Sequence, residues 1–133
     1  MTLGVRGVVL DGQNQVFLIR HTYVPGWHLP GGGVETGETA LEALDCELRE
    51  EACIAMDGPP SLFGVYFNNR ISRRDHVLVY VIRSFTVLQV KQPDREIAEA
   101  GFFPLDHLPE GTTSATRSRL AEILEGRPPS AHW

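Results

Sequence analysis

The feature of this sequence that most limits how it can fold is a run rich in glycine and proline that leads into a helix dense in carboxylates. The run covers residues 25–33 and ends in the triplet Gly31, Gly32 and Gly33. Glycine and proline at this density interrupt regular structure, so the whole run is predicted to be a loop. Because the triplet has no side chains, its backbone N–H groups can approach an anion closely.

The helix after this run is marked by its first turn and by one apolar stripe. Thr39 and Glu42 form the pattern of a capping box, in which each side chain binds the backbone of the other residue. Apolar residues at helical spacing predict the buried face of the helix: Leu41, Leu44, Leu48 and Ala52. The helix is expected to run on to about Asp57, before Gly58.

The same helix carries three glutamates on one side. Glu47, Glu50 and Glu51 stand at positions i, i+3 and i+4, so they share one face beside the apolar stripe. An exposed acidic face is the common explanation for such a pattern, although like charges at this spacing repel one another. Hard divalent cations such as Mg²⁺ or Mn²⁺ prefer carboxylate oxygens and keep several waters. Glutamates next to a glycine-rich run therefore favour a metal site that also receives phosphate.

Charge is distributed unevenly along the 133 residues, which carry a net charge of −5. A protein that binds nucleic acid through its phosphates normally shows the opposite balance, so we expect no extended nucleic-acid surface. Acidic residues concentrate in residues 35–51, whereas Arg70, Arg73 and Arg74 form a cationic segment. These arginines are either phosphate contacts or ordinary exposed loop residues. Together with the glycine triplet they are the candidate substrate-binding residues.

The remaining segments predict one α/β domain of the α+β type, covering residues 1–133. A turn at residues 11–12 is expected to join the first two strands as a hairpin. A second helix is expected over residues 113–124, and residues 127–133 are expected to be loose. Runs rich in branched and aromatic residues predict the strands: residues 3–10, 16–20, 62–67, 76–85 and 97–103.

Nothing in the sequence indicates a membrane or secreted protein. The longest strongly apolar run, residues 77–82, is far shorter than the ~20 residues of a membrane helix, and no secretory signal is visible. Cys46 and Cys53 lie about 10.5 Å apart along the expected helix, too far for a disulfide. We expect free thiols in a reducing compartment, and hence a cytoplasmic protein with no membrane partner.

Residues 32–54 resemble the Nudix box, G-x5-E-x7-R-E-U-x-E-E-x-G-U, in which U is a bulky aliphatic residue. Gly32, Glu38 and the helix glutamates match the specified positions, and residues 29–31 fit the usual lead-in. Two positions differ, because Cys46 replaces the arginine and Cys53 replaces the glycine. The length and the strand pattern fit a Nudix domain without additions.

The resemblance implies a Nudix fold, in which a mixed β-sheet is sandwiched between helices. It also implies hydrolysis of a nucleoside diphosphate linked to another moiety, with Glu47, Glu50 and Glu51 binding Mg²⁺ (or Mn²⁺) and Glu38 assisting. This chemistry agrees with the residues, since a metal neutralises phosphate charge and positions water while a carboxylate takes the proton. Glu50 is the first choice for that base.

Several alternatives stay open. Glu96 and Glu99 are additional candidate bases or ligands, or else exposed acids at a strand edge. Cysteine at position 46 can neither neutralise nor orient Glu50, which predicts a lower rate and keeps a non-catalytic nucleotide-binding module as a second hypothesis. Removal of the 5′ diphosphate from RNA is a third, which the acidic charge disfavours. Specificity must come from loops or a partner subunit, so a homodimer is one expectation.

Overall fold

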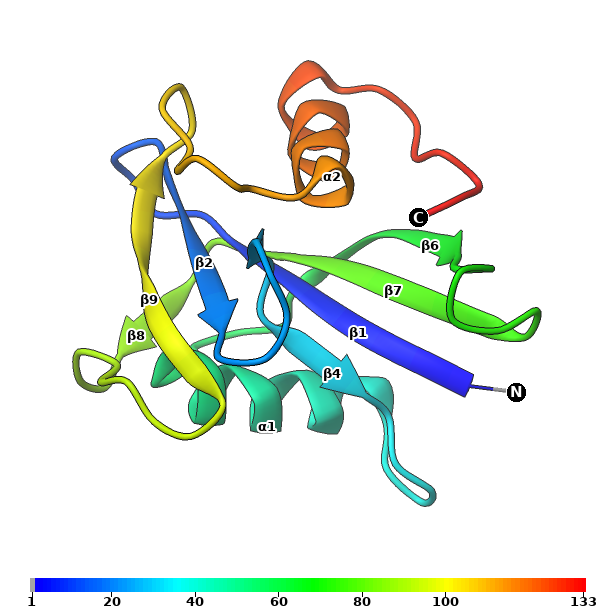
Figure 1. Cartoon of the computed structure of the whole chain (residues 1–133), viewed down its shortest axis with the longest axis horizontal. Helices are drawn as coiled ribbons and strands as arrows, with labels where there is room; N and C mark the ends of the chain where they lie inside the picture. The colour runs from blue at the N-terminus through cyan, green and yellow to red at the C-terminus, as the bar shows by residue number, and fades with distance from the viewer. Residues whose placement is uncertain (1) are drawn as a thin grey trace.

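The computed structural model describes residues 2–133 and contains strands and two helices in a mixed order (Figure 1). The elements follow one another along the chain as β1 Thr2–Val9, β2 Gln15–His21, β3 Trp27–His28, β4 Gly31–Gly33, α1 Ala40–Ala52, β5 Ile54–Met56, β6 Ser61–Phe67, β7 Asp75–Ile82, β8 Phe85–Val87, β9 Ile97–Pro104 and α2 Ser114–Glu125. The strands and helices expected from the sequence are present, and β3, β4, β5 and β8 are additional.

The largest sheet is mixed, as expected. Its strands lie in the order β4-β1-β7-β6, with β1 parallel to β7 and the other neighbours antiparallel. Parallel neighbours require a long crossover, and the chain between β1 and β7 contains α1. A second sheet has the order β3-β2-β9, and β5 pairs with β8. This topology places the glycine strand β4 at one edge of the main sheet.

The two helices cover opposite faces of the main sheet, with α1 below and α2 above in Figure 1. Successive residues of a strand point to opposite faces. Val5 therefore packs in the core beneath, with Leu44 and Leu48 of α1, whereas Val8 packs in the core above, with Leu120 of α2. The expected arrangement of a sheet between helices is confirmed.

The start of α1 follows the prediction, with one exception in its buried face. The Thr39 hydroxyl accepts a hydrogen bond from the Glu42 N–H at 3.0 Å, and the Glu42 carboxylate accepts one from the Thr39 N–H at 3.1 Å. Leu41, however, is 45% exposed and does not belong to the core. It lies in the first turn of the helix, before Ala43 and Leu44, with which the buried face begins.

The end of α1 contradicts the prediction. The helix stops at Ala52 and does not reach Asp57, because Cys53 adopts the left-handed conformation with φ 55° and ψ 41°. The Cys53 N–H donates to the Arg49 carbonyl at 3.2 Å, which closes the last turn. Ile54 then begins β5 and is fully buried. A cysteine here takes the conformation that glycine usually supplies.

The glycine triplet is a strand and not part of a loop. Gly31 and Gly32 pair antiparallel with Arg6 and Val5 of β1. A Cβ on Gly31 would lie 2.0 Å from the Val5 carbonyl oxygen, so only glycine allows this pairing. The prediction failed because glycine is usually unfavourable in strands, whereas here the close backbone approach requires it.

Two strand connections also differ from expectation. The first two strands meet only at the bridge between Leu10 and Val16 and then diverge into separate sheets, so the hairpin is short. The strand expected over residues 76–85 is divided, since β7 ends at Ile82 and β8 begins at Phe85. The break lets the chain leave the main sheet and pair with β5.

Residues 127–133 are docked on the domain, which contradicts the expectation that they are loose. The Phe67 N–H donates to the Ala131 carbonyl at 2.7 Å, and the Trp133 N–H donates to the Phe67 carbonyl at 2.9 Å. These bonds extend the edge of β6. The tail thus satisfies backbone groups of an edge strand that would otherwise face solvent.

A buried ion pair on α2 holds the same tail. The Arg119 guanidinium lies between the rings of Tyr66 and Trp133, 4.3 and 5.3 Å from their centroids. The Glu122 carboxylate accepts hydrogen bonds from Arg119 Nε at 2.9 Å and from the Ser130 N–H at 2.9 Å. Because both charges are buried and fully paired, losing one partner would cost several kcal/mol.

Two further expectations were about membranes and thiols. Within residues 2–133 no helix is both long enough and apolar enough to span a bilayer. Cys46 and Cys53 are free thiols, as predicted. Cys46 is exposed and Cys53 is partly exposed.

The left-handed cap of α1 makes a stability prediction. The left-handed conformation costs a residue with a Cβ about 1–2 kcal/mol of free energy, whereas glycine adopts it without this cost. Cys53→Gly is therefore expected to raise the free energy of unfolding by about 1 kcal/mol, which is a few degrees in the melting temperature of a domain this size. Cys53→Ala, which keeps the Cβ, is the matched control in thermal unfolding. A glycine variant that melts no higher than the alanine variant contradicts this account.

Candidate functional site

The helix α1 approaches the glycine strand β4 so closely that two of its glutamates contact glycine backbone. The Glu51 carboxylate accepts a hydrogen bond from the Gly31 N–H at 2.8 Å, and the residue is only 6% exposed. The half-buried Glu47 lies against Gly32, where a Cβ would be 2.6 Å from its carboxylate oxygen Oε1. The glycines thus leave the space into which the carboxylates of α1 project.

These groups line a cavity of about 360 Å³. Residues of β1, of the stretch from the end of β2 to β3, and of the segment before β9 also line it. The complete lining is Arg6, His21, Tyr23, Val24, His28, Gly31, Gly32, Glu47, Glu51 and Glu96. Five residues selected from the sequence therefore come together here: Gly31, Gly32, Glu47, Glu51 and Glu96. We name this cavity the glutamate cavity. It is lined by the glycines before α1, by glutamates of α1, and by Glu96, which is far along the chain from both.

The acidic side chains in the glutamate cavity disfavour one another's charged forms. Burial raises the pKa of Glu51 to about 7, and its bond from Gly31 only partly opposes this effect. Burial, and then the charge of Glu50, raise the pKa of Glu47. Such a cluster is relieved either by protons or by a cation.

Glu50, the first choice for the base, does not line the glutamate cavity. Its exposed carboxylate accepts a hydrogen bond from the Cys46 thiol at 3.3 Å, one helical turn earlier. This contact contradicts the expectation that Cys46 cannot orient Glu50, because a thiol is a weak donor. The hydrogen bond and the negative charge of Glu50 in turn raise the pKa of the Cys46 thiol.

Three other candidates lie outside the glutamate cavity. The Glu38 carboxylate accepts a hydrogen bond from the Glu35 N–H at 3.0 Å in the turn before α1, and its charge contributes to the raised pKa of Glu47. Glu99 pairs with Arg20 on the exposed side of β2 and β9. Gly33 is exposed at the end of β4, and nothing lies near the position of its absent Cβ.

The donor set suits a hard divalent cation, because three carboxylates line the glutamate cavity, those of Glu47, Glu51 and Glu96, and no sulfur does. Among residues 2–133, no three acidic, histidine or cysteine side chains are already grouped closely enough to hold an ion. Glu47 and Glu51 are fixed against β4, whereas Glu50 is exposed. Two candidate ligands are therefore positioned by packing, whereas the third candidate, Glu50, is not held against the strand.

Arg6 is the residue of this region that the sequence analysis missed. It is partly buried in the middle of β1, and its Nη1 donates to the Leu29 carbonyl at 2.9 Å. Burial lowers the pKa of its guanidinium, and the charges of Glu51 and Glu47 oppose this effect. An arginine within an otherwise apolar strand was the available signal, since such a charge is almost never buried without a partner.

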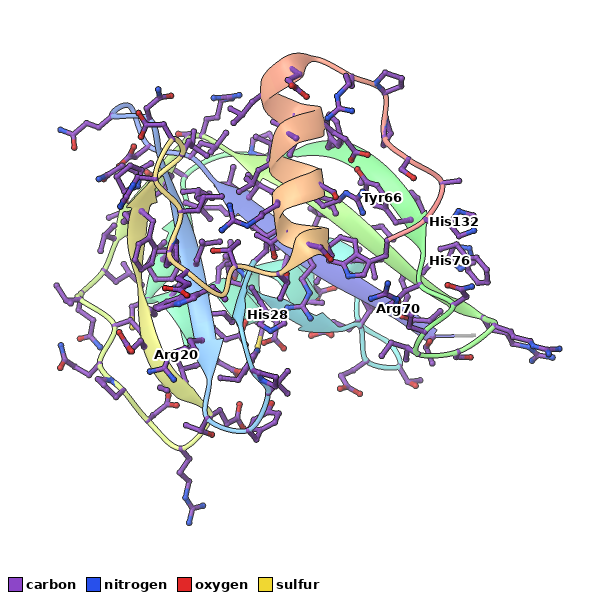
Figure 2. The ribbon with its side chains drawn as sticks, turned by 45° about the horizontal axis from the view of Figure 1, so that its top comes forward. Arg20, His28, Tyr66, Arg70, His76 and His132 are labelled. Atoms are coloured by element: carbon purple, nitrogen blue, oxygen red, sulfur yellow. The ribbon has the colours of Figure 1, made fainter. Side chains whose placement is uncertain are left out.

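A second cavity, of about 290 Å³, shares Arg6 and His28 with the first. Asn68 and Arg70 from the β6–β7 connection, the first turn of α2 and Trp133 form its other walls. Figure 2 shows His28 and Arg70 near the end of α2 at which the helix begins. We name it the helix cavity. Of the three loop arginines, Arg70 lines it, whereas the exposed Arg73 and Arg74 line neither cavity.

Comparison with solved structures supports this description. The chain is similar to the MutT Nudix hydrolase of Burkholderia pseudomallei, with a TM-score of 0.76 and 28% identity over 92% of this chain and 97% of that one. It is also similar to the MutT protein of Methanosarcina mazei, with a TM-score of 0.74 at 21% identity over 94% and 93% of the two chains. The second likeness shows the fold alone.

Curated sequences agree. An ADP-ribose pyrophosphatase of Methanocaldococcus jannaschii is 32% identical over 105 residues, which are 77% of this chain and 62% of that protein. A human 8-oxo-dGDP phosphatase is 33% identical over 124 residues, which are 90% of this chain and 37% of that protein. The chain thus spans between about a third and three fifths of the length of these relatives. The family model described as the NUDIX domain matches residues 1–123, and the chain belongs to the Nudix family.

Proposed function

We propose that the chain is a divalent-metal-dependent hydrolase that cleaves the diphosphate linkage of a small nucleotide or of a nucleoside diphosphate linked to another moiety. The observation that carries this proposal is the pair of helix carboxylates, Glu47 and Glu51, held against glycine backbone at a cavity that also contains Arg6. Carboxylates that can bind a metal ion, next to the guanidinium of Arg6, suit a substrate that carries phosphate. The activities for which the relatives are named, on ADP-ribose and 8-oxo-dGDP, support the same class.

The metal ligands in this proposal are Glu47, Glu50 and Glu51, with Glu38 in a supporting role. Nudix hydrolases are generally dependent on divalent metals, and we propose Mg²⁺ or Mn²⁺. When bound, such an ion neutralises charge on phosphate oxygens and lowers the pKa of a bound water. The Gly31 N–H holds the Glu51 carboxylate in place, so this side chain would lose little conformational freedom when the metal binds.

The proton acceptor is proposed to be Glu50, with Glu96 as the alternative. Glu50 is exposed and its carboxylate is contacted by the Cys46 thiol, so it can exchange protons with solvent. Glu96, from the segment before β9, lines the glutamate cavity. Glu99 is the weaker candidate, because its carboxylate pairs with Arg20.

For the substrate, we propose contacts to the backbone of Gly31 and Gly32 and to Arg70, which line the two cavities. Gly33, Arg73 and Arg74 remain candidates only if the loops that carry them close on a ligand. A substrate of this size requires no extended nucleic-acid surface. We also propose a cytoplasmic location, which the two free thiols support.

One observation keeps a second function in view, a nucleotide-binding module with little or no turnover. Cys46 stands where the family motif has an arginine, and its thiol gives Glu50 one weak hydrogen bond in place of a positive charge. Cys46→Arg separates the two functions. A rise from a measurable rate indicates an enzyme with a weakened base, whereas no turnover before and after the change favours the module.

The proposed function predicts metal-dependent turnover that requires the α1 glutamates. With Mg²⁺ or Mn²⁺, the protein is expected to release a nucleoside monophosphate or pyrophosphate from a panel of nucleoside triphosphates, ADP-ribose, nucleotide sugars, oxidised nucleotides and a 5′-triphosphorylated oligonucleotide, with products identified by mass spectrometry. Glu50→Gln should lower kcat/KM at least ~100-fold, the usual size of a lost acid–base group. Asp45→Asn is the control, since Asp45 pairs with Arg49 on an exposed part of the same helix.

This prediction has a clear failure. If the folded protein, saturated with metal, cleaves no member of the panel and Glu50→Gln behaves as the parent does, the chain is not a hydrolase of this class. Cleavage of the oligonucleotide alone would instead favour action on RNA ends.

The raised pKa of Glu51 makes the stability of the metal-free protein depend on pH. Its carboxyl has a pKa of about 7 when folded and an ordinary value of 4.5, so the folded state holds the proton more tightly. Glu51 therefore contributes stability below pH 4.5 that is lost as pH rises through 7. At about 1.4 kcal/mol per pKa unit, the loss is at most about 3 kcal/mol.

Thermal unfolding in the presence of a chelator measures this effect. The parent protein should lose more stability between pH 5 and pH 8 than Glu51→Gln does, and Mg²⁺ should stabilise the parent chiefly above pH 7, where the carboxylate is free to bind it. Parallel pH profiles for the two proteins would show that Glu51 is not the group that titrates.

A further inference from the structure

We propose that Arg6 is the residue that binds the diphosphate of the substrate, at the junction of the glutamate cavity and the helix cavity. This assignment rests on the proposed function, and it names a residue that the family motif does not contain. Of the loop arginines that the charge pattern suggested, Arg70 lines only the helix cavity, and Arg73 and Arg74 line neither cavity. Arg6 lies in a strand at the centre of the main sheet.

Position is the first argument. Arg6 and His28 line both cavities, so a molecule that occupies both must pass them. A nucleoside diphosphate linked to another moiety has its diphosphate in the middle. If each end occupies one cavity, the diphosphate lies at the junction, next to the guanidinium.

Unused hydrogen-bonding capacity is the second argument. A guanidinium has five N–H donors in a fixed fork, and within residues 2–133 the Arg6 side chain makes one hydrogen bond, to the Leu29 carbonyl. No acidic side chain forms a salt bridge with it among those residues. The remaining donors are therefore available at the cavity walls, where a phosphate can accept two of them in parallel.

The strand pairing fixes the position of this guanidinium. Arg6 is opposite Gly31 on β4 and opposite Val79 on β7, so its backbone is held on both sides. A Cβ on Gly31 would lie 2.8 Å from Arg6 Cδ, which shows that the side chain passes directly over the glycine. An arginine held this way loses little conformational entropy when it binds a ligand.

The charge of the site gives the third argument. Glu47 and Glu51 partly offset the positive charge of Arg6, which burial disfavours. A divalent cation on those carboxylates would take over their negative charge. The guanidinium would then lack these counter-charges, and a phosphate of the substrate would supply one. Metal and substrate binding are thus expected to reinforce each other.

Calorimetry with methylenediphosphonate, a diphosphate analogue whose P–C–P linkage cannot be hydrolysed, tests the assignment in the presence of Ca²⁺. Arg6→Lys keeps the charge beside the glutamates but loses the fork, and should weaken binding about 10-fold. Arg6→Gln should weaken it about 100-fold. Arg83→Gln, which removes an exposed charge between β7 and β8, should bind as the parent does.

A purely structural role for Arg6 gives a different result. In that case Ca²⁺ affinity and melting temperature fall in the Arg6 variants, while methylenediphosphonate binds each metal-saturated protein equally, and the proposal is overturned. Arg6→Lys carries the test alone if Arg6→Gln does not fold. Parent protein that binds the diphosphonate through Arg6 but hydrolyses nothing supports this assignment and contradicts the proposed function. Parent protein that binds no diphosphonate overturns the assignment.

Discussion

The site depends on one steric fact, the close approach of helix α1 to the edge strand β4. That approach is possible because Gly31 and Gly32 present no Cβ atoms to β1 and to α1. Glu51 then reaches the Gly31 N–H, and Glu47 fills the space next to Gly32. The leucines of α1 pack on the sheet and bring the helix into place. The same contact between helix and sheet therefore sets both the packing of the core and the positions of the carboxylates.

Electrostatics give this arrangement its chemical character. Burial raises the pKa values of two carboxylates, Glu47 and Glu51, and the negative charges of neighbouring glutamates add to this effect. The fold tolerates this cost because Arg6 lies nearby, one strand away from Gly31. Clusters of like charges that lower the stability of the fold are typical of functional sites. In the proposed function a cation would neutralise this cluster, and the charge of Arg6 would then be available to an anionic substrate.

The sequence was sufficient for the parts of this structure that depend on local patterns. Capping at Thr39 and the helical spacing of the glutamates are local, and both were predicted correctly. The strand formed by Gly31, the left-handed Cys53 and the cavity position of Arg6 depend on contacts with distant segments. Local propensity points the other way for the first two, because glycine disfavours strands and cysteine disfavours the left-handed region. The tail from residue 127 looked loose because its strand partner, Phe67, is distant in sequence.

Two neighbouring glycines of β4, Gly32 and Gly33, differ in what a Cβ would meet, so alanine at each position tests whether the glycine strand positions the metal ligands. Gly32→Ala places a methyl group 2.6 Å from the Glu47 carboxylate, which must move, whereas Gly33→Ala places one where nothing lies within 4 Å. Mn²⁺ binding should be measured by electron paramagnetic resonance, with thermal unfolding to show that both variants fold. We predict at least 10-fold weaker Mn²⁺ binding for Gly32→Ala and parent-like binding for Gly33→Ala. Equal affinity in both variants would contradict the claim that the glycine strand positions the metal ligands.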